Sequence, residues 1–414
     1  MRTRRIFLCG IALLLMVAWH TPMVFGGSID EAVAIAGNVK FHPVNGWTGG
    51  DGVSSIPLDE SRVAWLFGDS WYGRVIHGKR RPITMTHNAV AIQTNTNAGD
   101  FRKLPQKTLC PPASESFPTH DLRNARISFF FGRENAGKPT SFFDPPDHRG
   151  YFWPLHGIRS ARGLFVFLIQ IEATADTESV FGFHPCGSWL AFVPDADLTA
   201  NRDPETWRII YRKIPWAIFS AGKNRFWGSS VLEQNGNAYI YGIEEDQPES
   251  ASGKRLLLAR VSMDTIDSFG TWEFFAQGPD DSKTRWAKDF RRSKSLADRL
   301  PTEFSVTRAR GGHGTCGENN QGFDLIHSEI CLSPYIMRRW AQDPEGPWSE
   351  PSRIFRCPEA AKNIFCYAAK AHPEVSCTAG TAIVTYVANS LVFADLVNDA
   401  SLYWPRFFAA DVTP

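Results

Sequence analysis

Four carboxylates stand beside short apolar runs, where their side chains could act as acids and bases. Asp51 lies between two glycines in GWTGGDGVSSIPL, residues 46–58, and Asp69 follows the apolar run VAWLF. Glu303 opens an apolar run in TEFSVTR, and Glu374 lies in AKAHPEVS. Two carboxyl groups in different environments can hold different protonation states near neutral pH, which suits general acid and general base chemistry. Asp-Gly is also an ordinary turn signal, so the elements around these residues decide what they do.

The amino-terminal segment has the plan of a secretory signal. Residues 1–27 combine three arginines, an apolar run from Ile6 to Trp19 and small residues near Gly26. The run is shorter than the roughly 20 residues that a membrane span needs, so we expect cleavage near Gly26 and no membrane contact afterwards. The sequence therefore predicts an exported protein, periplasmic or extracellular, that acts as a monomer.

Charge and cysteine content limit the partners. The chain has 44 Lys and Arg against 43 Asp and Glu, a balance that predicts no nucleic-acid partner. Of eight cysteines, Cys9 falls in the predicted signal, which leaves an odd number. In an exported chain the others suggest one to three disulfides, with Cys316/Cys331 and Cys357/Cys366 as short-loop candidates.

The spacing of β-rich runs predicts the fold class. Short runs bounded by Gly, Pro, Asn or Asp indicate an all-β protein, and they form five pairs in which a small-residue strand precedes an aromatic, β-branched one. The pairs recur at intervals of 105, 71, 76 and 71 residues when one residue of each is set in register: Asp51, His156, Trp227, Glu303 and Glu374.

Such repetition predicts a five-bladed β-propeller with mostly four-stranded antiparallel blades around a central channel. We expect residues 28–414 to form this single domain, with an insertion near residues 94–150. A two-sheet sandwich is the alternative, but it leaves the five paired runs unexplained.

In a propeller the first strand of each blade lines the channel, so the residues that head these strands would converge on one axis. Converging polar side chains cost stability unless each is paired, which favours a functional site. We assign Asp51 as base or nucleophile, Glu374 as acid, Glu303 as the alternative acid and Asp69 as a residue that orients or tunes the others. Each also has a structural alternative, as a turn residue or a buried hydrogen-bonding carboxylate.

Eight motifs, in order, carry a family resemblance: GWTGGDG, WLFGDSW, HNAVAIQ, YFWPLHGI, FWGSSVLEQNGNAYIYG, TEFSVTR, AKAHPEVS and YVANS. Over about residues 39–408 the chain resembles the five-bladed propeller glycosidase superfamily, and within it the families of domains of unknown function 4185 and 5005, which include endo-D-arabinanase-like enzymes. The resemblance implies a carboxylate-lined pocket at one end of the channel and hydrolysis of a polysaccharide or oligosaccharide, with furanosyl glycans such as arabinan as candidates.

One position departs from that family. Relatives commonly carry an acidic residue where this chain has His156, so a non-catalytic carbohydrate-binding propeller is the alternative function. A propeller lyase or phosphoesterase is a weaker one.

Polar and aromatic residues beside the motifs are candidates for binding the sugar. Imidazole and amide groups can bond sugar hydroxyls, and indole rings offer flat apolar faces. The predicted substrate-binding set is His87, Asn88, Trp71, Trp153, His156, Trp227 and His372. We expect no required cofactor; such propellers can hold a Ca²⁺ in the channel, but no ligand set for it can be read from this sequence.

Overall fold

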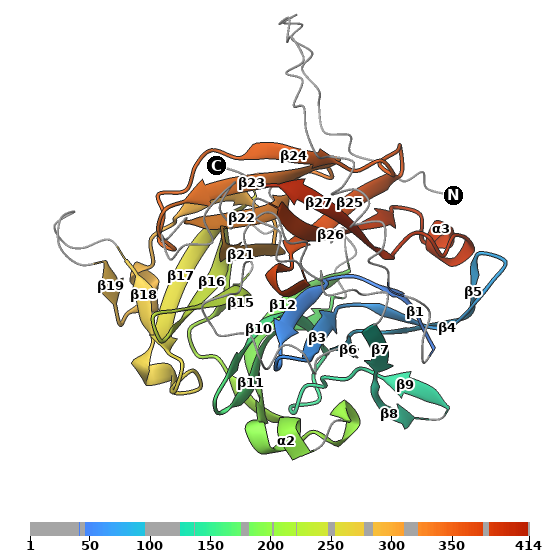
Figure 1. The fold of residues 1–414 in the computed structure, drawn as a ribbon, viewed down its shortest axis with the longest axis horizontal. Coiled ribbons are helices and arrows are strands. Elements are labelled where there is room, and N and C mark those ends of the chain that lie inside the picture. Colours follow the sequence, from blue (N-terminus) through green and yellow to red (C-terminus); the bar gives the residue numbers. More distant parts are fainter. Residues whose placement is uncertain are drawn as a thin grey trace, which may run out of the picture.

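The computed structural model describes residues 41, 46–95, 125–135, 137–174, 182–200, 203–220, 222–246, 253–276, 285–309, 322–375 and 381–412. These residues form antiparallel sheets with few and short helices, which confirms the all-β class (Figure 1). The predicted signal, residues 1–27, lies outside the described residues. So does much of the insertion predicted near residues 94–150, whose described parts include strand β7 and the β8–β9 hairpin.

Two four-stranded sheets come first along the chain. The first has the order β2 (Ser54–Pro57), β3 (Arg62–Phe67), β6 (Ala89–Asn95) and β7 (Ala125–Phe130). The second has the order β10 (Tyr151–Ser160), β11 (Gly163–Ala173), β12 (Phe183–Pro194) and β13 (Ile210–Lys213).

Three further sheets follow. The third contains β14 (Ile218–Ser220), β15 (Lys223–Gln234), β16 (Asn237–Asp246), β17 (Lys254–Ser262), β18 (Glu273–Phe275) and β19 (Trp286–Ala287), with β20 (Ala297–Leu300) paired to β17. The fourth contains β21 (Phe304–Arg308), β22 (Phe323–Ser328), β23 (Tyr335–Ala341) and β24 (Ser352–Arg356). The fifth contains β25 (Ile364–Ala371), β26 (Thr381–Ser390) and β27 (Pro405–Asp411).

The smaller elements lie outside these sheets. A three-stranded sheet has the order β1 (Trp47–Gly50), β4 (Ser70–Ile76) and β5 (Lys79–Thr86), and β8 (Gly132–Asn135) pairs with β9 (Lys138–Thr140). The helices are α2 (Asp195–Ala200), α3 (Phe393–Asn398) and the 3₁₀ turns Pro204–Thr206, Phe269–Thr271, Phe290–Arg292 and Pro373–Val375. Within the described part of the chain, no helix is both long enough and apolar enough to cross a membrane.

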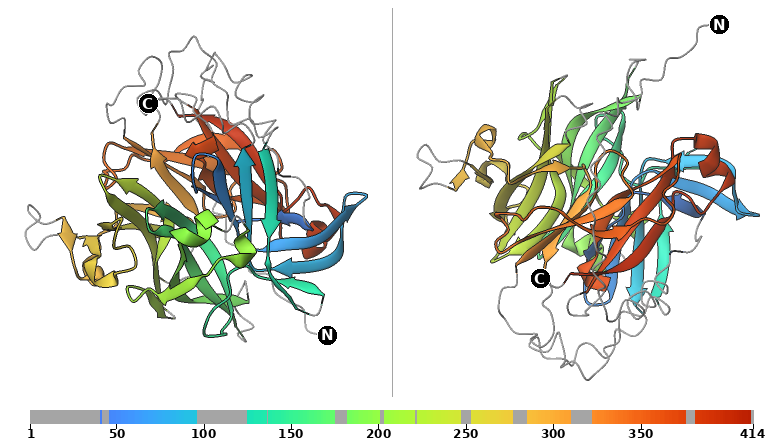
Figure 2. Two further views of the ribbon diagram at one scale, coloured as in Figure 1. Left: turned by 60° about the horizontal axis from the view of Figure 1, so that its bottom comes forward. Right: turned by 90° about the horizontal axis from the view of Figure 1, so that it is seen from above.

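The five larger sheets stand around a common centre, with β2, β10, β15, β21 and β25 innermost (Figures 1 and 2). Hydrogen bonds in which a side chain is donor or acceptor link each of these strands, or the residue that follows it, to the next strand. They join Ser54 Oγ to the Leu155 carbonyl (2.7 Å), the Val231 N–H to His156 Nδ1 (3.0 Å), the Val306 N–H to Ser230 Oγ (2.9 Å), the Ala371 N–H to Ser305 Oγ (2.7 Å) and Ser55 Oγ to His372 Nδ1 (2.5 Å).

Aromatic side chains fill the space between neighbouring sheets. Trp227 is fully buried, and its indole N–H donates to the Trp216 carbonyl at 2.6 Å. Gly228 follows with φ +100°, and a Cβ at this position would lie 2.2 Å from Phe167 Cβ. Glycine is therefore required where the inner strand of the third sheet packs against the second.

The described residues include four of the eight cysteines: Cys186, Cys331, Cys357 and Cys366. Cys357, after β24, and Cys366, in β25, are buried free thiols in hydrogen-bond contact with each other. The structure thus brings the predicted Cys357/Cys366 pair together without a bond between the sulfurs. Cys316 of the other predicted pair lies outside the described residues.

Candidate functional site

The carboxyl group of Asp51 is held where the first sheet meets the fifth. Asp51 joins β1 to β2, and its Oδ2 accepts hydrogen bonds from the hydroxyls of Tyr367, in β25, and Tyr403, just before β27; the latter measures 2.6 Å. The Gly68 N–H donates to the Asp51 carbonyl at 2.8 Å, and a Cβ at Gly68 would lie 2.5 Å from Asp51 Oδ1. Both Asp51 oxygens therefore have fixed surroundings before any ligand binds.

The surroundings of Asp51 favour its protonated form. Burial raises its pKa most, the nearby charges of Asp69 and Glu303 raise it further, and the two tyrosine hydroxyls oppose the change; the resulting pKa is about 8. At neutral pH Asp51 thus carries a proton, although an exposed aspartate would be ionised.

Glu303 has the opposite environment, because it is paired with a buried cation. Lys370 Nζ lies 2.9 Å from Glu303 Oε1 and donates to the Gly52 carbonyl, also at 2.9 Å. The Lys370 side chain is only 4% exposed, against 24% for Glu303. A buried ammonium needs a partner, and this ion pair gives Glu303 a counter-ion that Asp51 lacks.

Asp69 is anchored by the aromatic residues that surround it. Trp153 Nε1 donates to Asp69 Oδ1 at 2.9 Å, and His87 Nδ1 lies 3.2 Å from the same oxygen. The His87 ring stacks on Tyr151, with centroids 3.6 Å apart and planes 13° apart. Asp69 follows β3, His87 follows β5, and Tyr151 and Trp153 lie in β10, so the first two sheets and the β4–β5 hairpin build a partly exposed aromatic wall beside Asp51.

Glu374 lies elsewhere. It belongs to the 3₁₀ turn after β25 and sits 3.9 Å from His372, whose Nδ1 bonds Ser55. Ser55 is four residues further along the chain than Asp51, a separation of about 13 Å in an extended strand. The structure therefore brings Asp51, Asp69 and Glu303 together and leaves Glu374 toward the opposite end of the ring.

The predicted register of the five inner strands also differs from the observed one. Pairing shifts at equivalent bulges between Pro154 and Gly157 in β10, between Trp227 and Ser230 in β15, and between Tyr367 and Lys370 in β25. Residues 367–370 of β25 are therefore the ones equivalent to the bulges of β10 and β15, and Glu374 is not. This explains why Tyr367 and Lys370 reach the carboxylates.

Several predicted sugar-binding residues are used by the fold instead. Asn88 is fully buried and bonds the backbone of Phe143 and Phe152. Buried His372 bonds Ser55 and Thr385, and His156, whose pKa burial lowers to about 4, accepts the Val231 N–H as a link in the ring.

The three tryptophans predicted to bind sugar also divide into buried and accessible side chains. Trp71 is buried against Phe393 and the Arg80 guanidinium, and Trp227 is buried between sheets. Neither offers a face to a sugar. Trp153 and His87 remain placed to contact one.

Four residues of this site were missing from the predicted set: Tyr151, Tyr367, Lys370 and Tyr403. Lys370 alternates with His372 and Glu374 in AKAHPEVS, but only the observed bulge shows that it faces the carboxylates. Tyr403 carried no sequence signal, because it meets Asp51 only when the ring closes.

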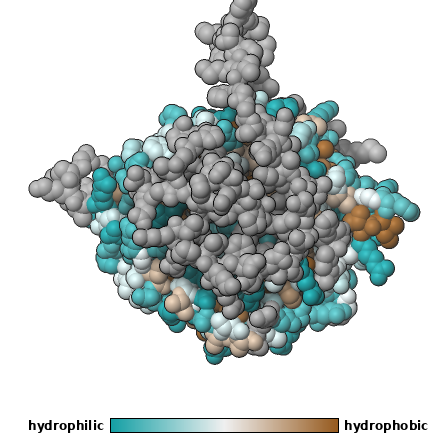
Figure 3. All heavy atoms as spheres, in the orientation of Figure 1, coloured by the Kyte–Doolittle hydropathy of each residue, from teal (hydrophilic) through white to brown (hydrophobic). Residues whose placement is uncertain are grey.

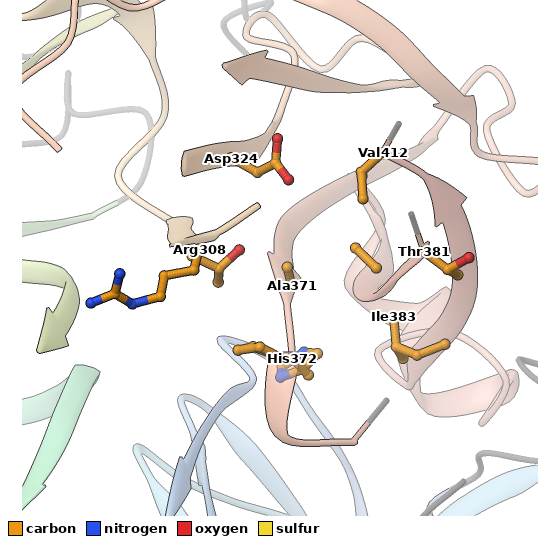
Figure 4. A pocket seen from close by; sticks show the side chains of 10 residues that line it. Arg308, Asp324, Ala371, His372, Thr381, Ile383 and Val412 are labelled. Atoms are coloured by element: carbon orange, nitrogen blue, oxygen red, sulfur yellow. The ribbon is translucent and has the colours of Figure 1, made fainter. Parts of the chain in front are cut away.

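Among the described residues, no group of three or more His, Cys, Asp or Glu side chains could hold a metal ion. A small cavity between the fourth and fifth sheets includes His372, Arg308 and Asp324 (Figure 4). There Arg308 points away from Asp324, whose carboxylate pairs with Arg338 at 2.7 Å.

Comparisons with known proteins agree with this architecture. The family model described as "Domain of unknown function (DUF5005)" matches residues 38–411. The crystal structure of "a putative hydrolase from Bacteroides ovatus ATCC 8483" matches 91% of this chain and 88% of its own at 16% identity, with a TM-score of 0.60, which shows a shared fold.

Two further solved structures are more distant. A thermostable family-43 glycoside hydrolase matches at 14% identity, over 90% of this chain and 92% of its own, with a TM-score of 0.40. An exo-1,5-alpha-L-arabinanase from a bovine ruminal metagenomic library matches at 9% identity, over 88% and 93%, with a TM-score of 0.39. No curated protein sequence matches this chain.

Proposed function

We propose that this chain, which belongs to the DUF5005 family, is a glycoside hydrolase that cleaves a polysaccharide or oligosaccharide. The observation that carries the proposal is the pair formed by Asp51 and Glu303. One carboxyl group is driven toward its protonated form by burial and like charge, and the other is held by the Lys370 ammonium. Hydrolysis of a glycosidic bond needs two carboxyl groups in these two states.

Asp51 acts as the general acid and protonates the leaving oxygen. Glu303 acts as the base or nucleophile. Its Oε1 lies close to Asp51, because a Cβ placed on the adjacent Gly52 would be 3.2 Å from Glu303 Oε1. This assignment reverses the role predicted for Asp51 and replaces Glu374. Asp69, anchored through Oδ1, orients a substrate hydroxyl through its other oxygen.

The substrate is a neutral glycan. Three carboxyl groups converge on the site and its lysine is already paired, so an acidic sugar would meet uncompensated negative charge. The aromatic wall of His87, Tyr151 and Trp153 suits the apolar face of a neutral ring. Furanosyl glycans such as arabinan are the first candidates, on the motif resemblance.

The non-catalytic alternative rests on His156, which replaces an acidic residue of relatives. His156 here bonds the neighbouring inner strand, and the Asp51–Glu303 pair is present without it. We therefore favour catalysis over binding alone.

The function is tested by product release from arabinans, galactans and other neutral polysaccharides, with an acidic polysaccharide as the comparison. We expect the exported protein to release sugar from a neutral member and not from the acidic one. Saturable glycan binding without release would favour the binding propeller, and elimination products would indicate a lyase.

The finer architecture is also proposed. Five sheets joined in a closed ring support a single five-bladed propeller over residues 28–414 that is exported after cleavage near Gly26.

In the oxidising compartment, a disulfide catalyst that accepts two electrons would oxidise the Cys357 and Cys366 thiols to a disulfide, releasing two protons. This bond closes a short loop and is expected to stabilise the protein by about 2–3 kcal/mol.

Mass spectrometry of the alkylated, unreduced exported protein tests the disulfide. We expect a linked Cys357–Cys366 peptide and a lower Tm for Cys357→Ser. Full alkylation of both thiols in the native exported protein would disprove the bond.

A further inference from the structure

Large apolar side chains gather on one edge of the molecule. Of the eight that the described residues expose, six belong to the β4–β5 hairpin and to the start of α3: Val75, Ile76, Met85, Leu391, Val392 and Phe393. Leu391 is 64% exposed and Phe393 57%. We call these six residues the hairpin–α3 surface; Figure 3 shows a brown patch at the right edge, where Figure 1 places the hairpin and α3. A contiguous apolar patch on a protein surface commonly marks an interaction site.

The surface is rigid, because a buried arginine fixes the hairpin to α3. Arg80 Nη1 donates to the Leu396 carbonyl within α3, and its Nη2 donates to the carbonyls of Leu402 (2.7 Å) and Ala400 (3.2 Å), which follow the helix. The Ala400 N–H donates a hydrogen bond to the Gly78 carbonyl, in the turn of the hairpin, at 2.7 Å. All views place α3 beside the hairpin, which projects from the ring of sheets (Figures 1 and 2).

Cationic side chains surround the apolar ones. Arg74, Lys79 and Arg81 are exposed on the same hairpin, and none belongs to an ion pair with another described residue. Lys79 lies directly across the strand pair from Ile76. Two carboxylates lie in or just after α3: Asp395 accepts a hydrogen bond from the Ser390 hydroxyl, and Asp399 accepts one from the Ser401 N–H. Long cationic side chains can lie along an apolar patch and carry their charge to its rim.

We propose that the hairpin–α3 surface docks on the headgroup layer of an anionic lipid bilayer. A projecting tip with apolar side chains can enter the boundary between headgroups and acyl chains, while cations around it meet lipid phosphates. A second copy of this chain fits less well, because a two-fold contact through this surface would bring the cations Arg74, Lys79 and Arg81 of both copies into one interface. The proposal replaces the sequence prediction of no membrane contact and is independent of the proposed hydrolysis.

The test is co-sedimentation of the exported protein with vesicles of phosphatidylglycerol and phosphatidylcholine, against vesicles of phosphatidylcholine alone. We expect binding to the anionic vesicles that weakens in high salt. The double variant Leu391→Ser/Phe393→Ser and the charge variant Lys79→Glu/Arg81→Glu are each expected to lose about tenfold in affinity. The matched control is Ile210→Ser/Leu332→Ser, since these are the other two exposed large apolar residues, and it should bind as the parent does.

Thermal unfolding of each variant verifies that it is folded. Equal binding of the parent to both vesicle types, no binding at all, or unchanged binding of both surface variants would overturn the proposal. A concentration-dependent dimer that Leu391→Ser/Phe393→Ser abolishes, without vesicle binding by the parent, would instead assign the surface to self-association.

Discussion

Replacing Glu303 with Gln is expected to lower kcat on the natural glycan by at least about 10⁴-fold, because the amide can act neither as a base nor as a nucleophile. Asp51→Asn should cost about 10²- to 10⁴-fold on the same glycan through loss of the proton donor. The two variants separate on aryl glycosides with acidic leaving groups. The leaving groups of these substrates depart without being protonated. Asp51→Asn should therefore keep most of its activity on them, and Glu303→Gln should not.

The pH–rate profile tests the role of Asp51 independently. A general acid must be protonated, so activity should fall as pH rises through about 8, where Asp51 ionises. This basic limb should disappear in Asp51→Asn. The folded state also disfavours the Asp51 charge, so at neutral pH Asp51→Asn should unfold at a temperature no lower than the parent does.

Glu374→Gln is the matched control, since it removes a carboxylate that the sequence placed in the acid's role but the structure places near His372. We expect its kcat to stay within about twofold of the parent's. Activity lost in Glu374→Gln but kept in Glu303→Gln would return the acid's role to Glu374 and contradict the site described above.

The repeated strand pairs predicted an all-β fold of successive sheets because each pair is a local pattern. Asp51 and Glu303 became candidates for the same reason: each comes just before an inner strand. Glu374 could not be placed, because the bulge between Tyr367 and Lys370 shifts β25 relative to its motif. A bulge adds a residue without any obligatory change in composition, so the register of hydrophobic residues does not reveal it.

Contacts that depend on closure of the ring of sheets could not be predicted from the sequence either. Tyr403 and Asp51 are 352 residues apart and meet only because the fifth sheet returns to the first. Trp71 and Trp153 both stand beside motifs, yet one packs beneath Arg80 while the other reaches Asp69. Motif proximity identified candidates for sugar binding, and only tertiary packing separated the buried rings from the accessible ones.

Lys370→Met is expected to have the second large effect, about 10²-fold in kcat/KM at neutral pH, with Lys370 acting as a positioning residue for Glu303. Removing the ammonium leaves Glu303 without its counter-ion and without the 2.9 Å contact that holds its carboxyl group in place. The measurement is kcat/KM and Tm of Lys370→Met beside Lys370→Arg and the parent.

Lys370 also donates to the Gly52 carbonyl, so a purely structural role must be separated from this one. Loss of the bond to Gly52 alone would lower Tm together with activity. Loss of the cation beside Glu303 should lower kcat more than Tm, and Lys370→Arg, which keeps the charge, should recover most of the lost kcat. Equal losses of kcat in Lys370→Met and Lys370→Arg, each with a lower Tm, would show that Lys370 only ties the fifth sheet to the first.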